Sequence, residues 1–142
     1  MNRPDISIEE LLPHRDRMLL IDEIIELDDE KAVTGATVTD QWPFFDGEVV
    51  NSLVIIELIA QTSGISNGWV RIKEKGKNSE KKGWLVGIKQ AQIFIDTVPL
   101  NTRIITLSEN KFKYEDYREV LGIARIGPDI VAKIILQLIQ EH

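Results

Sequence analysis

A dense run of apolar residues between positions 52 and 72 contains a single carboxylate, and this combination constrains the fold more than any other feature of the chain. The length and apolar density of the run predict a helix from Ser52 to Ile72. Apolar side chains would point in all directions from its first half, so we expect that half to be enclosed on every side. Glu57 lies inside it. A buried carboxylate is costly unless it is paired, protonated or used in chemistry.

Length, charge and cysteine content exclude several classes of protein. We expect a single domain over residues 1–142, which is long enough for a real core. A net charge of −6 argues against nucleic-acid binding, and the absence of cysteine excludes disulfides, thiolate catalysis and zinc–thiolate sites. We therefore expect no metal site. No N-terminal apolar segment resembles a signal peptide. No apolar run reaches the roughly 20 residues of a membrane-spanning helix, so we expect a cytoplasmic protein with no membrane span.

The segments around the long helix are dominated by strand-forming patterns. Ser7 to Glu10 has the form of a capping box, which predicts a short helix from Ile8 that Pro13 ends. Loops are expected over Trp42 to Gly47 and over the lysine-rich stretch Arg71 to Lys82. The predicted strands are Met18 to Leu27, Ala32 to Thr39, Trp84 to Ile95, Arg103 to Tyr114, Arg118 to Ile126 and Ile130 to Gln140. This order predicts an α+β fold in which an antiparallel sheet wraps one long helix.

Four stretches of the chain form a recognisable set. They are Leu11-Leu12-Pro13-His14-Arg15 with Met18-Leu19-Leu20-Ile21-Asp22, then Phe44-Phe45-Asp46-Gly47, Ile55-Ile56-Glu57-Leu58-Ile59-Ala60-Gln61 and Leu85-Val86-Gly87-Ile88. In this order they resemble the hotdog-fold dehydratases of fatty-acid synthesis, which act on (3R)-hydroxyacyl chains bound to acyl carrier protein. The dehydratase-like proteins of aryl-polyene lipid pathways, which have shorter loops, are similar as well. The resemblance covers residues 11–140 and is strongest in the helix.

The resemblance implies a fold, a substrate class and an assembly. It implies a hotdog fold that assembles at least as a dimer, either as a homodimer or as a heterodimer with a related hotdog subunit. The substrate would be an acyl thioester carried by acyl carrier protein or by coenzyme A, with no cofactor beyond that phosphopantetheine arm. Glu57 would be the catalytic residue that acts on the substrate hydroxyl. Phe45 and Gly87 would lie in substrate-binding segments.

Dehydration of a 3-hydroxyacyl thioester needs a base, an acid and donors that face the thioester oxygen. A carboxyl group among apolar side chains keeps its proton to higher pH, which suits Glu57 to the role of acid. Backbone N–H groups of Asn51 and Ser52, at the start of the helix, could bind the thioester oxygen, and either residue could cap the helix. Gln61 follows Glu57 by one turn, so it either orients the carboxyl group or only packs the helix.

The base is the missing part of this arrangement. The dehydratases that the chain resembles have a catalytic histidine after the loop glycine, and here Gly47 is followed by Glu48. Glu48, His14 and a histidine of a partner subunit are the candidates, and the partner, or no dehydration at all, is the preferred interpretation. The alternatives are a silent subunit that binds acyl chains or stabilises an active partner, and a thioesterase.

The predicted loop from Arg71 to Lys82 could bind a partner protein. It carries an excess of basic residues, Arg71, Lys73, Lys75, Lys77, Lys81 and Lys82. On an acidic chain this excess could dock an acidic carrier protein, or it could simply keep a surface loop soluble.

Overall fold

The computed structural model describes residues 6–12, 18–76 and 83–140. The helices and strands in chain order are α1 (Ile8–Leu11), β1 (Glu23–Leu27), β2 (Lys31–Thr37), β3 (Val49–Asn51), α2 (Val54–Lys75), β4 (Gly83–Ile93), β5 (Thr97–Pro99), β6 (Arg103–Tyr114), β7 (Tyr117–Ile126) and β8 (Asp129–Gln140). Among these residues no helix is both long enough and apolar enough to cross a membrane.

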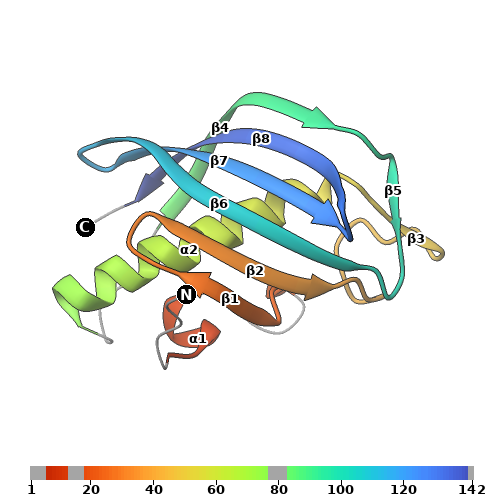
Figure 1. Cartoon of the computed structure of the whole chain (residues 1–142), viewed down its shortest axis with the longest axis horizontal. Helices are drawn as coiled ribbons and strands as arrows, with labels where there is room; N and C mark the ends of the chain where they lie inside the picture. Colours follow the sequence, from red (N-terminus) through yellow and green to blue (C-terminus); the bar gives the residue numbers. More distant parts are fainter. Residues whose placement is uncertain (1–5, 13–17, 77–82, 141–142) are drawn as a thin grey trace.

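Six strands form one antiparallel sheet in the order β1-β2-β6-β7-β8-β4. The sheet curves around α2, which runs along its inner face, and α1 packs beneath the helix near the β1 edge (Figure 1). Strands β3 and β5 pair separately at one end of the molecule. The expected α+β arrangement of one long helix wrapped by an antiparallel sheet is therefore confirmed.

Close contact between α2 and the sheet depends on small residues of the inner face. A Cβ atom built on Gly122 of β7 would lie 2.2 Å from Cγ2 of Ile59. This glycine therefore leaves the space that the Ile59 side chain fills. One polar contact joins the same two layers, because the hydroxyl oxygens of Thr34 in β2 and Thr62 in α2 lie 2.8 Å apart in the core.

The predicted bounds and surroundings of the long helix need correction. The helix begins at Val54, two residues late, and ends at Lys75, so the first turns of the predicted basic loop are helical. Its first half is largely buried but not enclosed on every side, since Ile56, Glu57 and Ala60 are half-buried and Leu53, just before the helix, is 49% exposed. The expectation of burial on every side is wrong for this single chain.

The short N-terminal helix forms where the capping box predicts it. The Ser7 hydroxyl accepts from the Glu10 backbone, and the Glu10 carboxylate accepts from the Ser7 backbone. Pro13, its expected terminator, lies outside the described residues. The segment packs tightly on α2, because a Cβ atom on Gly68 would lie 2.5 Å from the Leu11 carbonyl oxygen. Arg71, expected in a surface loop, is instead buried and donates to the Glu10 carbonyl oxygen.

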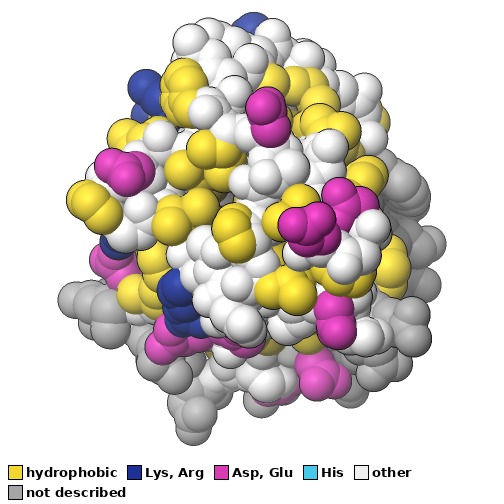
Figure 2. Space-filling view, turned by 90° about the vertical axis from the view of Figure 1, so that its right-hand side faces the viewer, with side chains coloured by type: hydrophobic (Ala, Val, Ile, Leu, Met, Phe, Trp, Pro, Cys, Tyr) yellow, Lys and Arg dark blue, Asp and Glu magenta, His cyan; other side chains and the backbone are white. Residues whose placement is uncertain are grey.

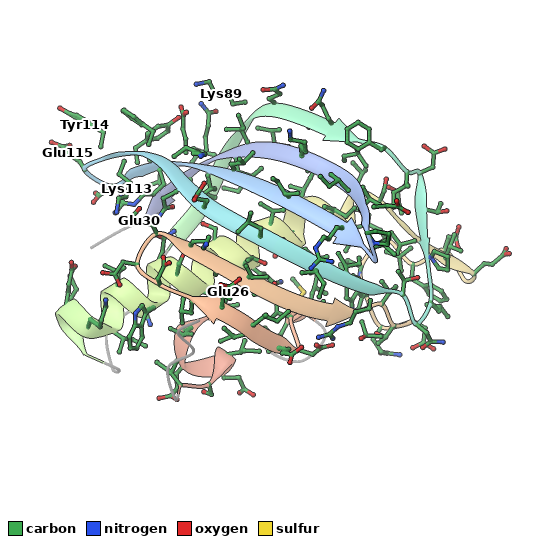
Figure 3. The ribbon with its side chains drawn as sticks, in the orientation of Figure 1. Glu26, Glu30, Lys89, Lys113, Tyr114 and Glu115 are labelled. Atoms are coloured by element: carbon green, nitrogen blue, oxygen red, sulfur yellow. The ribbon has the colours of Figure 1, made fainter. Side chains whose placement is uncertain are left out.

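The six strands of the large sheet follow the sequence pattern, although several of their ends differ by one or two residues, and the pattern does not predict β3 or β5 as strands. β6 has the predicted bounds, and β7 and β8 each begin one residue earlier than expected. β1 begins only at Glu23, because the backbone at Met18 and Leu20 bonds to Gln61 of α2, and the chain reaches β2 only at Asp22, whose amide donates to the Gly35 carbonyl oxygen. Lys113 of β6 and Glu30 of the β1–β2 turn lie side by side, with Nζ 2.6 Å from Oε1 (Figure 3).

Candidate active site

Glu57 lies in the first turn of α2 and is half-buried. Its Oε2 atom accepts a hydrogen bond of 2.9 Å from Nε2 of Gln61, one helical turn further along. Glu57 is thus neither in open solvent nor sealed in the core. A carboxyl group that is held in one orientation and is not sealed in the core can be reached by a ligand.

Gln61 is fully buried, and every polar atom of its side chain has a partner. Besides the bond to Glu57, Nε2 donates to the Met18 carbonyl oxygen at 2.6 Å, and Oε1 accepts from the Leu20 backbone amide at 3.0 Å. The amide orientation is fixed, because the reversed amide would place its oxygen against two acceptors and its NH2 group against a donor. Gln61 therefore ties the carboxyl group of Glu57 to the chain that enters β1.

The loop before α2 folds as a tight hairpin. Phe45 forms a bridge with Val50, and Oδ1 of Asp46 accepts from the backbone amides of Glu48 and Val49, each at 2.9 Å. The bond from Val49 is the largest cause that lowers the pKa of Asp46 below its usual value, and the bond from Glu48 is the second. Asp46 is therefore a turn-forming residue.

The hairpin separates Glu48, a candidate for the base, from Phe45, which the resemblance places in a substrate-binding segment. Its tip leaves Glu48 exposed, whereas Phe45 is half-buried and packs against the core. Phe44 adopts a left-handed backbone (φ 65°), and the residue is 54% exposed.

The backbone amides proposed as thioester donors are already engaged inside the chain. The Ser52 N–H donates to the Asp96 carbonyl oxygen at 3.0 Å, and the Asn51 N–H donates to that of Phe44 at 3.1 Å. The cap of α2 is Leu53, which makes no side-chain cap bond, so the predicted cap at Asn51 or Ser52 is wrong. The Asn51 side chain instead accepts from the Leu53 amide at 2.9 Å.

Gly87 lies away from the helix. A Cβ atom on Gly87 would lie 2.4 Å from Oε1 of Gln137, whose neighbours Leu136 and Leu138 face the core. Because side chains alternate along a strand, Gln137 and this side of Gly87 face outward. The glycine leaves room for a side chain on the outer face of the sheet and lines no surface that faces α2.

The strand that carries Gly87, β4, is one of the two edges of the large sheet. β4 pairs with β8 on one side only, and large apolar side chains stand exposed along it, namely Leu85 (45%), Val86 (57%) and Ile88 (46%). An exposed apolar edge is a template for pairing with another chain. The end of the molecule that carries β3 and β5 shows scattered patches of hydrophobic side chains, with acidic side chains among them (Figure 2).

A protein-family model described as ApeP-like, ApeP dehydratase, matches residues 6–133, which is most of the chain. The chain belongs to the ApeP-like dehydratase family. The residues that bring Glu57 and Gln61 together, and the segment that follows Met18, all lie inside this match.

Similar proteins agree with this assignment. The 3-hydroxyacyl-(acyl-carrier-protein) dehydratase FabZ of Streptococcus sanguinis is 32% identical over 133 residues, which cover 90% of this chain and 88% of that protein. FabZ of Caldanaerobacter subterraneus is 30% identical over 142 residues, with 96% of each chain covered. Among solved structures, the dehydratase heterocomplex ApeI:P from Xenorhabdus doucetiae contains a chain with a TM-score of 0.85, 21% identity and 98% and 93% coverage. This chain therefore has the hotdog fold.

Two predicted parts of the site are not, or only partly, covered by the described residues. His14 and the residues from Lys77 to Lys82 lie outside the described part of the chain, so the basic loop is described only in part. Its first lysine, Lys73, forms an ion pair with Asp29 and lies 5.1 Å from the centre of the Trp69 ring. Sequence reasoning also missed the role of the Met18–Leu20 backbone, because backbone groups carry no residue-type signal.

Proposed function

We propose that this chain is one subunit of a dehydratase that acts on 3-hydroxyacyl thioesters in lipid biosynthesis, and that it supplies Glu57 to a site shared with a second hotdog subunit. The single observation behind this proposal is the carboxyl group of Glu57, held by the buried amide of Gln61 at the open side of α2. Membership of the ApeP-like dehydratase family gives the reaction class.

Glu57 would act as the general acid. A base removes a proton from C2 of the thioester, the C3–O bond breaks, and Glu57 gives its proton to the departing hydroxyl, which leaves as water. The electron pair of the C2–H bond becomes the C2=C3 double bond, in conjugation with the thioester. The base would be a histidine of the partner subunit, because Glu48 occupies the position that the resemblance assigns to that residue.

The partner would pair along β4. The two edges of the large sheet differ. β1 is short, and Asp22 just before it forms a salt bridge with Arg103 (Nη1 to Oδ1, 2.7 Å), whereas β4 is long and carries exposed aliphatic side chains. Pairing along β4 would cover Val86 and Ile88. It would also place a second subunit near the side of α2 on which Leu53 and Glu57 are incompletely covered.

The remaining roles follow from where the residues lie. Glu48, at the exposed hairpin tip, would face the partner and contact substrate from there, while Phe45 would hold the hairpin on the core. Asn51 and Ser52 would position the start of α2 through their hydrogen bonds, since their N–H groups are engaged. The thioester would arrive on acyl carrier protein or coenzyme A, with no other cofactor.

A silent, stabilising subunit is the second candidate, and one observation favours it. Gly47 is followed by Glu48, at the position to which the resemblance assigns the catalytic histidine. In that case β4 would still bind the partner, and Glu57 would only support α2 through Gln61.

One assay separates these functions. The purified chain is incubated with a 3-hydroxyacyl carrier-protein substrate, alone and with a histidine-bearing hotdog homologue from the same genome, and enoyl product and free thiol are measured. The proposal expects little turnover alone and turnover in the mixture that Glu57→Gln abolishes. Turnover in the mixture that Glu57→Gln leaves intact supports the silent subunit. Release of free thiol points to thioester hydrolysis, and full turnover by the chain alone rules out a base from the partner.

A further inference from the structure

The outer face of the large sheet is apolar along its middle, although no described helix lies on it. Both helices pack on the inner side of the sheet (Figure 1). An antiparallel sheet with one face toward water normally carries polar side chains there. In this chain the outward positions of the central strands include six large aliphatic residues: Val33, Ile105, Leu107, Leu121, Ile123 and Ile135.

Their outward direction follows from strand alternation. On β6, Ile104, Thr106 and Ser108 are buried against α2, so Leu107 between them points away from it. On β7, the inward position is fixed by Gly122, whose missing side chain would meet Ile59 of α2. The residues on either side of Gly122 therefore face outward. All six aliphatic residues are half-buried, as side chains on an uncovered sheet are.

One row of directly paired residues crosses five strands of this face. In order across β1, β2, β6, β7 and β8 it reads Glu26, Val33, Leu107, Ile123 and Lys133. The row therefore has an acid at one end, three aliphatic side chains in the middle and a base at the other end. Leu121 and Ile135, directly paired with each other on β7 and β8, widen the apolar centre in the next outward row.

The two charges at the ends of this row are available for a partner. Among the residues that the structure describes, neither Glu26 nor Lys133 forms a salt bridge. Arg103, on the same face, is by contrast engaged, since it binds both Asp22 and Glu23. Glu26 is labelled in Figure 3, where its side chain lies over the β1–β2 side of the sheet.

We propose that this outer face is an interaction surface and that its partner is the same face of a second copy of the chain. A two-fold axis that runs parallel to the strands above Leu107 would stack Leu107 on its own copy and Val33 on Ile123. It would also place Glu26 of each chain over Lys133 of the other. An interface of this kind is self-complementary, as two-fold symmetry requires. Two sheets stacked face to face lie about 10 Å apart, close enough for these side chains to meet.

This interface is separate from the subunit pairing proposed along β4. The edge extends the sheet sideways, whereas the outer face stacks one sheet on another, so both can be occupied in one assembly. A substitution at one surface should leave the other intact. Substitutions on β4 and substitutions on the outer face therefore test the two interfaces separately.

The first test is the mass of the purified chain in solution, measured by native mass spectrometry or light scattering, with a protomer mass of 16.2 kDa. We expect Leu107→Lys to halve the mass of the wild-type assembly. Ile88→Lys, a matched change of an exposed aliphatic residue on β4, should not separate face-stacked copies. A monomeric wild type, or a wild-type mass that Leu107→Lys leaves unchanged, would overturn the proposal. Thermal unfolding of Leu107→Lys establishes that the variant is folded.

The second test reverses the charges at the ends of the row. Glu26→Lys and Lys133→Glu should each weaken the stacked assembly at low salt, because each places like charges opposite one another. The double variant restores opposite charges and should recover the wild-type mass. Equal losses in both single variants and no recovery in the double variant would show that these residues do not face each other.

Discussion

Nε2 of Gln61 lies 2.9 Å from Oε2 of Glu57, and the same amide group binds the backbone at Met18 and Leu20. The one carboxyl group of the apolar helix start is thus attached to the segment that leads into β1. Its orientation depends on a residue that would touch no substrate. Gln61 is therefore a positioning residue for Glu57 in the proposed chemistry.

Replacement of Gln61 by methionine tests this role. Gln61→Met removes both donors and the acceptor, so the Leu20 N–H and the Met18 carbonyl oxygen lose their partners, at a cost of about 1–3 kcal/mol in the free energy of unfolding. The carboxyl group of Glu57 would then be misplaced. The dehydratase formed by this chain and its partner should therefore lose about 10- to 100-fold in kcat, with a smaller change in KM. Gln41→Met, at an exposed glutamine, is the control. A destabilised variant with unchanged kcat would reduce Gln61 to a packing residue.

Two sheet glycines should respond differently to alanine. The new Cβ of Gly122→Ala would meet packed atoms of Ile59, at 2.2 Å, and overpacking of this kind costs about 1–3 kcal/mol. The new Cβ of Gly35→Ala would meet only the guanidinium end of the half-exposed Arg103 side chain, and this end can move. We therefore expect Gly35→Ala to cost less than about 1 kcal/mol. Denaturant unfolding of both variants measures the difference, and equal costs would contradict the close fit of α2 on β7.

A double variant identifies the source of the Gly122 effect. Ile59→Ala alone should destabilise by about 2–5 kcal/mol, because it leaves a cavity between helix and sheet. When it is combined with Gly122→Ala, the two changes should be less costly together than their sum, since the new methyl group enters the vacated space. Strict additivity would mean that the two side chains do not compete for the same volume.

Stability at acidic pH should depend on a cluster on the outer face of the sheet. The Tyr117 hydroxyl, 2.8 Å away, and Lys89 Nζ, 3.1 Å away, donate to the Glu119 carboxylate and lower its pKa below 4.5. The folded chain therefore binds this proton less readily than the unfolded chain. The resulting stabilisation is complete above about pH 4.5 and is lost as the pH falls through the lowered pKa.

Tyr117→Phe removes the larger cause of that shift. The variant should lose less Tm than the wild type when the pH is lowered from about 5.5 to about 3.5, because less stabilisation remains to be titrated. Tyr114→Phe, at an exposed tyrosine of the same hairpin, is the control. If the wild type and Tyr117→Phe lose equal Tm over this interval, the hydrogen bond does not govern the ionisation of Glu119.

The sequence predicts those parts of the fold that local patterns encode. The bounds of β6 follow from its β-branched composition and its flanking turns, and the capping box at Ser7 gives the start of α1. The pairing of Gln61 with Glu57 follows from their spacing on a helix. The sequence also identifies the family, through the segment around Glu57.

What the sequence does not predict depends on tertiary contacts. β1 begins late because the chain from Met18 satisfies Gln61 before it joins the sheet, and no residue type marks that choice. The N–H groups of Asn51 and Ser52 suggested thioester donors, yet they are taken by carbonyl groups of Phe44 and Asp96, which neighbour them only in the folded chain. A hydrophobicity pattern also does not predict which side of the long helix is left uncovered, because it does not distinguish apolar residues buried within the chain from those that another subunit would bury.

The most direct test of the central claim is the dehydration rate of the mixture of this chain with a histidine-bearing hotdog partner, with Glu57→Gln or Glu48→Gln in this chain alone. The amide of glutamine keeps the size of the side chain but cannot donate the proton that the departing hydroxyl needs. The account expects Glu57→Gln to lower kcat by at least about 100-fold and Glu48→Gln to change it far less. A mixed enzyme that keeps its full rate with Glu57→Gln would contradict the claim that this chain supplies the acid.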